Sequence, residues 1–164
     1  GFVAHVATFR TIEVMDIRAL SNTIPNVEFV QADCMSPFDD KFTEYCDSAS
    51  SLHAIEHFGL GRYGDSVDVN GHLKGLANLY KMLKPEGILY FSVPIGPQRI
   101  EFNAHRVFSV GYLLSYFQGK YKLKSFSYVD DKGDLHRDIT LSDNNISDNM
   151  GCRYGCGIFI LEKI

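Results

Sequence analysis

Two histidines and a glutamate stand directly after a short strand-like segment. Residues 47–52 have the small and apolar side chains of a strand, and His53, Glu56 and His57 follow at once. Histidine can take a proton from a hydroxyl or amine near neutral pH, and a carboxylate can orient its ring. Because ligands in open α/β sheets bind beyond the carboxyl ends of strands, we interpret these residues as catalytic candidates. The alternative is that both histidines only form structural hydrogen bonds at this corner.

The order His-x-x-Glu-His over residues 53–57 also matches a zinc hydrolase motif, whose two histidines project from one helix. Gly59 and Gly61 would interrupt such a helix, and a strand-like segment precedes it. Zinc hydrolysis is therefore a remote alternative, and we expect no metal. The four cysteines, at positions 34, 46, 152 and 156, are predicted to be reduced thiols.

Two aspartates also follow strand-like segments. Asp16 ends one of them, the place from which a carboxylate in nucleotide-binding α/β folds accepts hydrogen bonds from ribose hydroxyls. It could instead be solvated or paired with Arg18. Asp33 follows the next segment, where a carboxylate would suit the exocyclic amine of adenine. Aspartate is common in such loops, so the position of Asp33 alone is a weak signal.

Four further residues are candidates for substrate contacts. Arg62 and Tyr63 lie in a glycine-rich loop, 58–65, and the arginine would suit a phosphate or carboxylate on a substrate. An ordinary surface loop is the alternative. His105 and Arg106 lie between a strand and a helix, on the side of the sheet where the strands end. His105 would line an acceptor site, whereas Arg106 would serve there or form a structural ion pair.

The pattern of apolar residues predicts the elements that position these side chains. We expect strands at 11–17, 26–30, 47–52, 88–93, 121–129 and 157–164, and helices at 71–84 and 109–117, the second with Ser109 as its N-cap. The run 88–93 predicts a strand buried on both faces. The alternation predicts one α/β domain with a mostly parallel sheet, helices on both faces and a C-terminal antiparallel strand pair. The polar stretch 130–155 would be able to fold over the site.

Composition narrows the class of protein. The chain has 164 residues, of which 45% are hydrophobic and 22% charged, as in an ordinary globular domain. A net charge of -4 gives no reason to expect nucleic acid as a partner, because that binding depends on positive charge. No apolar run approaches the roughly 20 residues that span a membrane, and no secretory signal is visible. We expect a cytoplasmic protein.

These motifs together resemble a known family. Residues 47–58 look like the fourth-strand segment of class I S-adenosylmethionine-dependent methyltransferases, and residues 83–87 resemble their Leu-Lys-Pro-Gly-Gly turn before strand five. Residues 1–9, 15–18 and 53–65 look like a bacterial and nematode family of unassigned function, DUF268. The resemblance implies the Rossmann-like methyltransferase fold. It also implies S-adenosylmethionine as the cofactor, bound by Asp16, Asp33, Cys34, Ser51 and Leu52.

The beginning of the chain departs from this family pattern. Such enzymes open with a central strand and a glycine-rich loop, whereas this chain starts at Gly1 and Phe2, which resemble the tail of that loop. We therefore expect residues 1–164 to form a single domain that lacks the first strand and is N-terminally incomplete. Unpaired backbone groups in mid-sheet would each cost roughly 1–3 kcal/mol if buried. A homo-oligomer or another chain that supplies a strand would repair the sheet.

The resemblance predicts methyl transfer to a small molecule, with a sugar or polysaccharide precursor as the favoured class. Methyl transfer needs alignment of the reactants, plus a base when the acceptor is a hydroxyl. We interpret His57 or His53 as that base, with Glu56 orienting a histidine. The alternative function is a non-catalytic methyltransferase-fold module that has lost its cofactor loop and serves in binding or assembly.

Overall fold

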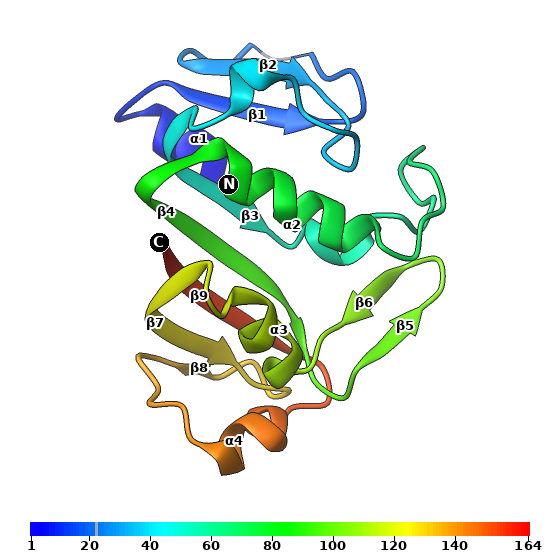
Figure 1. Cartoon of the computed structure of the whole chain (residues 1–164), viewed down its shortest axis with the longest axis vertical. Helices are drawn as coiled ribbons and strands as arrows, with labels where there is room; N and C mark the ends of the chain where they lie inside the picture. Colours follow the sequence, from blue (N-terminus) through cyan, green and yellow to red (C-terminus); the bar gives the residue numbers. More distant parts are fainter. Residues whose placement is uncertain (22) are drawn as a thin grey trace.

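The computed structural model describes residues 1–21 and 23–164, which form an α/β fold with short helices between the strands (Figure 1). The α-helices are α1 (Phe2–Ala7), α2 (Gly71–Met82), α3 (Val110–Phe117) and α4 (Asp143–Ser147), and the single-turn 3-10 helices are η1 (Asp40–Phe42), η2 (Ile55–His57) and η3 (Asn149–Gly151). The strands are β1 (Ile12–Asp16), β2 (Val27–Gln31), β3 (Cys46–Leu52), β4 (Leu83–Ile95), β5 (Arg99–Glu101), β6 (His105–Val107), β7 (Tyr121–Val129), β8 (Leu135–His136) and β9 (Gly155–Lys163).

The strands form one larger and two smaller sheets. The larger sheet has the order β3-β4-β9-β7-β8, in which β3 and β4 run parallel and β9 runs antiparallel to both β4 and β7. The parallel pair β1-β2 lies above it in Figure 1, and β5 and β6 form a separate hairpin. The predicted α/β class and the antiparallel strands at its end are therefore confirmed. The larger sheet is mixed and not mostly parallel, because β3-β4 is its only parallel pair among the described strands.

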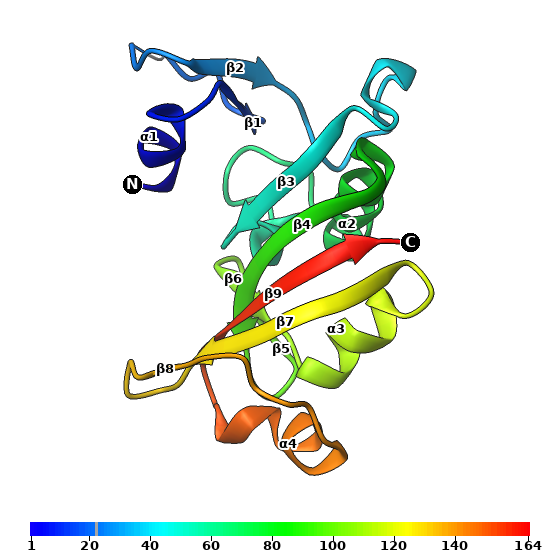
Figure 2. The ribbon, with the colours of Figure 1, turned by 90° about the vertical axis from the view of Figure 1, so that its left-hand side faces the viewer.

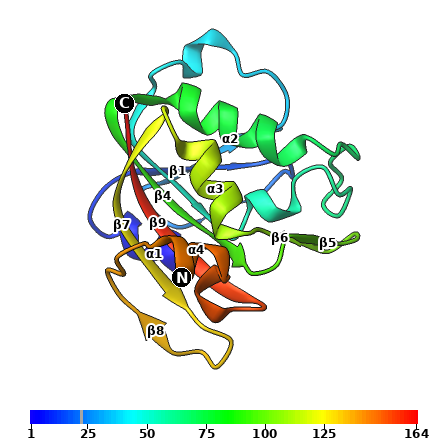
Figure 3. The ribbon, with the colours of Figure 1, turned by 60° about the horizontal axis from the view of Figure 1, so that its bottom comes forward.

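The main core lies between the larger sheet and two helices. Figures 2 and 3 show α2 and α3 on the same side of this sheet. Phe159 and Leu161 of β9 are fully buried on that side, and the Phe159 ring lies 5.6 Å from the ring of Phe117 in α3. The alternate β9 residues Ile158 and Ile160 are only half-buried. Alternation along β9 therefore separates a core face from a more open face.

The expectation that residues 88–93 are buried on both faces is wrong on one face, where Ile88 is only half-buried and Tyr90 is exposed. Tyr90, in the middle of β4, is 42% exposed, whereas its neighbours Leu89 and Phe91 are fully buried. Tyr90 pairs with Ile160 of β9 on the more open face of the sheet. The strand is continuously apolar in sequence, but its position opposite α2 and α3 leaves this phenol ring accessible.

No strand of the described chain connects the two parallel pairs. β1 pairs only with β2, and β3 pairs only with β4. The side chains still link the two sheets, because the Tyr45 hydroxyl donates a hydrogen bond to the Glu13 carboxylate at 2.7 Å. This arrangement agrees with the expectation that a strand between β1 and β3 is lacking.

The element boundaries follow the local sequence signals closely. Ser109 caps α3 by accepting a hydrogen bond from the Tyr112 backbone N–H at 3.2 Å, as predicted. Helix α2 ends two residues earlier than expected, because Leu83 already pairs with Cys46 as the first residue of β4. No helix in the part of the chain that the structure describes is long and apolar enough to cross a membrane.

The polar stretch 130–155 packs mainly against the fold and does not cover the site. It contains β8, α4 and η3, and α4 contacts α3. Ile139, Leu141, Ile146 and Met150 pack against the main core. Only its last residues reach towards the site, where the Tyr154 ring lies 5.2 Å from the ring of His105.

Candidate functional site

A cavity of about 330 Å³ lies where β1, β2 and β3 end. The side chains that line it come from the segments after these three strands and from the glycine-rich loop. They are Met15, Asp16, Ile17, Arg18, Ala32, Asp33, Cys34, Met35, His53, Ala54, His57, Phe58, Tyr63 and Asp65. Parallel strands place their carboxyl ends at one edge, which explains why residues from separate parts of the sequence meet here.

Asp16 is held at the edge of the cavity by Arg18. Its Oδ1 accepts hydrogen bonds from the Arg18 backbone N–H at 2.9 Å and from Nε at 3.0 Å, and Oδ2 accepts one from Nη2 at 2.8 Å. The hydrogen bonds from Arg18 lower the pKa of Asp16 below its ordinary value. A carboxylate has about four lone-pair sites, so Oδ2 can still accept a hydrogen bond from a hydroxyl.

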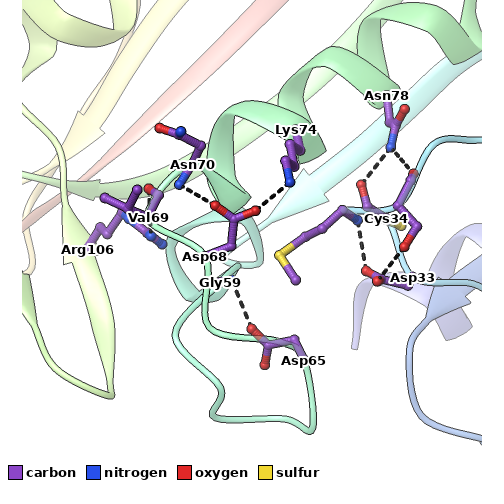
Figure 4. Close-up of polar contacts among 12 residues, drawn as sticks. Asp33, Cys34, Gly59, Asp65, Asp68, Val69, Asn70, Lys74, Asn78 and Arg106 are labelled. Atoms are coloured by element: carbon purple, nitrogen blue, oxygen red, sulfur yellow. Dashed lines mark hydrogen bonds and ion pairs between the residues drawn. The ribbon is translucent and has the colours of Figure 1, made fainter.

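Asp33 stabilises the next turn of the cavity wall. Its carboxylate accepts hydrogen bonds from the Met35 backbone N–H at 2.9 Å and from the Ser36 hydroxyl at 2.8 Å. The amide of Asn78, on α2, donates to the carbonyl of Cys34 at 2.8 Å (Figure 4). Burial raises the pKa of the Cys34 thiol to about 11, so this side chain contributes apolar surface to the cavity.

The glycine-rich loop is organised around one carboxylate. Asp65 accepts hydrogen bonds from the backbone N–H groups of Gly59 at 2.8 Å, Gly61 at 3.2 Å and Tyr63 at 3.1 Å (Figure 4 draws the first of these). Burial opposes the ionisation of Asp65, but these hydrogen bonds outweigh it and lower the pKa. Gly59 has a φ of 76°, and a Cβ there would lie 2.0 Å from the Asp68 carbonyl oxygen. The loop is therefore a defined turn that depends on glycine.

In the neutral ring of His57, Nε2 is the nitrogen that carries no proton. Its Nδ1 lies 2.6 Å from the Ala104 carbonyl oxygen, which can only accept, so Nδ1 carries the proton in the neutral ring. Its Nε2 lies 3.8 Å from Glu56 Oε1, and the ring lies edge-on to Tyr63 at 5.3 Å. The neutral ring can therefore accept a proton at Nε2, and the nearby carboxylate would stabilise the resulting imidazolium.

His53 differs from His57, because both of its ring nitrogens have partners. Nδ1 lies 3.0 Å from Glu56 Oε1, and Nε2 lies 3.1 Å from the Sγ of Cys156 on β9. These hydrogen bonds, the one to Cys156 first, raise the pKa of His53 to about 10. His53 also has a φ of 53°, a left-handed conformation that is uncommon for a residue with a side chain.

The carboxylate of Glu56 is buried and lies close to the rings of both His53 and His57. Its side chain is only 2% exposed, and Oε1 is the atom that approaches both rings. His53 precedes η2, a single 3-10 turn, and His57 is its last residue, so the two histidines do not project from one α-helix as the zinc hydrolase interpretation requires. Among the described residues there is no cluster of three or more histidines, cysteines or carboxylates that could hold a metal ion.

Arg106 does not contact the cavity. Its side chain is buried, and its guanidinium donates hydrogen bonds to the backbone carbonyls of Glu56, Phe58 and Val69. Figure 4 shows it beside Val69, where the loop joins α2. The substrate-binding role predicted for Arg106 is therefore replaced by a structural one. Carbonyl oxygens, and not the expected carboxylate, are its partners.

Other predicted site residues lie around the cavity without lining it. Ser51 is buried and Leu52 is 39% exposed, and neither is among the lining residues. Arg62 lies outside, with its guanidinium 5.8 Å from the centre of the Tyr63 ring. The ring of His105 lies 6.4 Å from the ring of His57, next to the cavity.

Sequence reasoning missed three residues of this site. The sequence indicates Arg18 only as a partner of Asp16, yet this residue lines the cavity and its guanidinium lies 5.0 Å from the centre of the Tyr63 ring. Asp65 organises the glycine-rich loop, and an aspartate among glycines is a turn signal that could have identified it. Cys156 contacts His53 from a distant strand, and no local pattern indicates this contact.

This chain matches the model of one protein family, and it has no significant match among curated proteins. The model of the family described as "Caenorhabditis protein of unknown function, DUF268" matches residues 6–153. A comparison with curated proteins gave no significant match.

Solved structures with the same fold include methyltransferases. The 1,6-didemethyltoxoflavin-N1-methyltransferase of Burkholderia thailandensis has a TM-score of 0.59 and 16% identity, over 92% of this chain and 60% of that one. The N-methyltransferase NodS of Bradyrhizobium japonicum, in complex with S-adenosylhomocysteine, has a TM-score of 0.60 and 12% identity, over 99% and 71%. The [4+2]-cyclase SpnF has a TM-score of 0.61 and 14% identity, over 97% and 68%. At these identities the similarity shows a shared Rossmann-like methyltransferase fold.

Proposed function

This chain belongs to the DUF268 family, and we propose that it is a methyltransferase domain that uses S-adenosylmethionine to modify a small molecule. The chain spans about three fifths of the length of the first methyltransferase structure that it resembles. The observation that carries the proposal is the cavity at the ends of β1, β2 and β3, which brings Asp16, Asp33 and His57 together. Fold alone does not determine function, so the proposal depends on what these residues can do.

The polar groups of the cavity fit an adenosine-containing cofactor. Asp16 retains a lone-pair site on Oδ2 for a ribose hydroxyl, and each oxygen of Asp33 has one protein donor and room for another. Met15, Ile17 and the buried Cys34 add apolar surface beside these carboxylates. When bound, S-adenosylmethionine would supply a methyl group on a positively charged sulfur.

His57 is the group best placed to act as a general base. Its Nε2 carries no proton in the neutral ring, because the Ala104 carbonyl holds the proton on Nδ1. Nε2 would take the proton from an acceptor hydroxyl, and Glu56 would stabilise the imidazolium that forms. His53 suits this role less well, since both its nitrogens are already occupied by Glu56 and Cys156.

The acceptor that we propose is a sugar or a polysaccharide precursor. Tyr63 lines the cavity, and His105 and Tyr154 lie near one side of it, so aromatic rings with polar atoms border the cavity. Such side chains combine an apolar face with a hydrogen-bonding tip, which matches the apolar C–H faces and hydroxyls of a sugar. The guanidinium of Arg62, over the Tyr63 ring, would meet a phosphate if the sugar carries one.

Replacement of Asp16 by alanine is expected to weaken the binding of S-adenosylhomocysteine about tenfold. Loss of one charge-assisted hydrogen bond to ribose costs about 1.4 kcal/mol, which corresponds to a tenfold change in Kd. Isothermal titration calorimetry of the 164-residue chain measures both affinities. Asp40→Ala is the matched control, because this carboxylate is fully exposed and pairs only with Lys81. Equal affinities of Asp16→Ala and the unmodified chain would contradict the assignment of Asp16.

The free strand edges favour a second candidate, a methyltransferase-fold module that serves in binding or assembly. β1 and β3 each pair on only one side in the described chain, so both retain backbone donors and acceptors for a further strand. The same titration separates the two functions. Micromolar binding of S-adenosylhomocysteine would support the enzyme, and no heat change at millimolar ligand would support the module.

A further inference from the structure

Cys156, the imidazole of His53 and the buried carboxylate of Glu56 are connected in series by two hydrogen bonds. Its Sγ lies 3.1 Å from His53 Nε2, and His53 Nδ1 lies 3.0 Å from Glu56 Oε1. The carboxylate can only accept, so Nδ1 donates to it and Nε2 shares a proton with the thiol. A thiol, an imidazole and an orienting carboxylate in this order are the arrangement that activates a cysteine nucleophile.

The carboxylate is an independent sign that this array is adapted to hold positive charge. Glu56 is 2% exposed, and its Oε2 has no hydrogen-bond partner among the described residues. A buried carboxylate is costly unless a positive group lies beside it. The imidazolium that forms when His53 takes the proton of Cys156 would provide that charge. Glu56 therefore favours transfer of the proton from sulfur to nitrogen.

The other three cysteines lack such an array and provide internal comparisons. Burial raises the pKa of Cys34 and of Cys152 to about 11, and it also raises the pKa of Cys46. The Sγ atoms of Cys46 and Cys152 approach backbone carbonyls at 3.7 and 3.8 Å, and neither has a hydrogen bond to an imidazole among the described residues. Cys156 is partly accessible, on the more open face of the larger sheet.

We propose that Cys156 is a nucleophilic thiol, activated by His53 and Glu56, and that it is a site of covalent modification by alkylating electrophiles. In the reaction, the thiol proton moves to His53 Nε2 and the sulfur forms a bond to the electrophilic carbon. The bond from that carbon to its leaving group breaks, and the leaving group departs with the electron pair. No oxidant or cofactor is required, so the proposal does not depend on methyl transfer.

Modification of Cys156 would change the lining of the cavity through its effect on His53. This histidine lines the cavity and contacts Cys156 with the same ring. An alkyl group on the sulfur removes the shared proton and adds bulk beside Nε2. The ring would then lose one of the two contacts that fix its position.

Iodoacetamide is the probe that tests this proposal, with peptide mass spectrometry to follow each cysteine. At pH 7 and without added cofactor, we expect Cys156 to be alkylated at least about tenfold faster than Cys46, which is also partly accessible. In His53→Asn this advantage should disappear. Asparagine tolerates the left-handed backbone of residue 53 but cannot take up the proton.

Two further variants complete the test. Glu56→Gln, which removes the negative charge, should also slow alkylation of Cys156. His5→Gln, a change on α1, should leave the rate unaltered. A Cys156 rate no higher than that of Cys46 would overturn the proposal. So would an unchanged or faster rate in His53→Asn, because exposure alone would then explain the reactivity.

Discussion

Replacement of Arg106 by leucine is expected to lower the free energy of unfolding by about 3 kcal/mol, because it leaves up to three buried carbonyl groups without donors. Arg106 is 2% exposed, and its guanidinium reaches the carbonyls of Glu56, Phe58 and Val69. Urea unfolding, followed by circular dichroism, measures the change. The chain has no tryptophan to report it by fluorescence.

Arg62→Leu is the matched control for this experiment. Arg62 lies between Phe58 and Val69, whose carbonyls Arg106 contacts, but its only described contact is with the Tyr63 ring. Surface substitutions of this kind usually change stability by less than about 0.5 kcal/mol. If Arg106→Leu were as stable as Arg62→Leu, the structural role assigned to the buried guanidinium would be wrong.

Acidification should destabilise the protein through His72. This histidine, at the start of α2, is 8% exposed, and its Nε2 lies 2.7 Å from the Tyr112 hydroxyl. Burial, followed by the positive charge of Arg106, lowers the pKa of His72 to about 4, although the backbone of Val69 and the charge of Asp68 act in the opposite direction. The ordinary pKa of histidine is near 6.5, so between pH 6.5 and 4 the unfolded chain binds more protons.

The stability contributed by neutral His72 is therefore present above pH 6.5 and is lost as the pH falls towards 4. At 1.36 kcal/mol per pKa unit, the loss approaches about 3 kcal/mol. Urea unfolding at a series of pH values measures it, with His72→Gln as the comparison because glutamine does not titrate. Parallel stability curves for the two proteins would show that His72 is not the group responsible.

The arginine and histidine effects should be coupled. The guanidinium of Arg106 contributes to the low pKa of His72. Without that positive charge, protonation of His72 becomes less unfavourable. The pH dependence of Arg106→Leu should accordingly be shallower than that of the unmodified protein, which a double variant with His72→Gln would resolve.

The parts of the fold that the sequence predicted well are those fixed by local chemistry. Ser109 has the side chain of an N-cap and α3 begins at the next residue. Asp16, Asp33, His53 and His57 meet in one cavity because each lies at or shortly after the end of a strand, and the expected parallel pairs bring strand ends together. Their proposed roles in binding and catalysis remain predictions.

The parts that could not be predicted depend on contacts between distant segments. Arg106 has the same local setting as a substrate-binding arginine, and only the packing of the loop after η2 shows that carbonyls surround it. Cys156 belongs to a glycine-rich stretch that gives no sign of an imidazole nearby, because His53 lies on the other side of β4 from β9. Tyr90 is exposed because its face of the sheet is more open.

The position of β9 between β4 and β7 has a consequence for how the protein reaches its native state. β9 follows both neighbours in the sequence, so the larger sheet cannot close until this strand has been synthesised and inserted. Pairings between segments so far apart raise the contact order and slow folding, typically to the order of milliseconds to seconds. Until then, β4 and β7 expose unpaired edges that can associate with other chains. The contact between His53 and Cys156 forms only in this last step. Only chains with a complete larger sheet therefore have this contact.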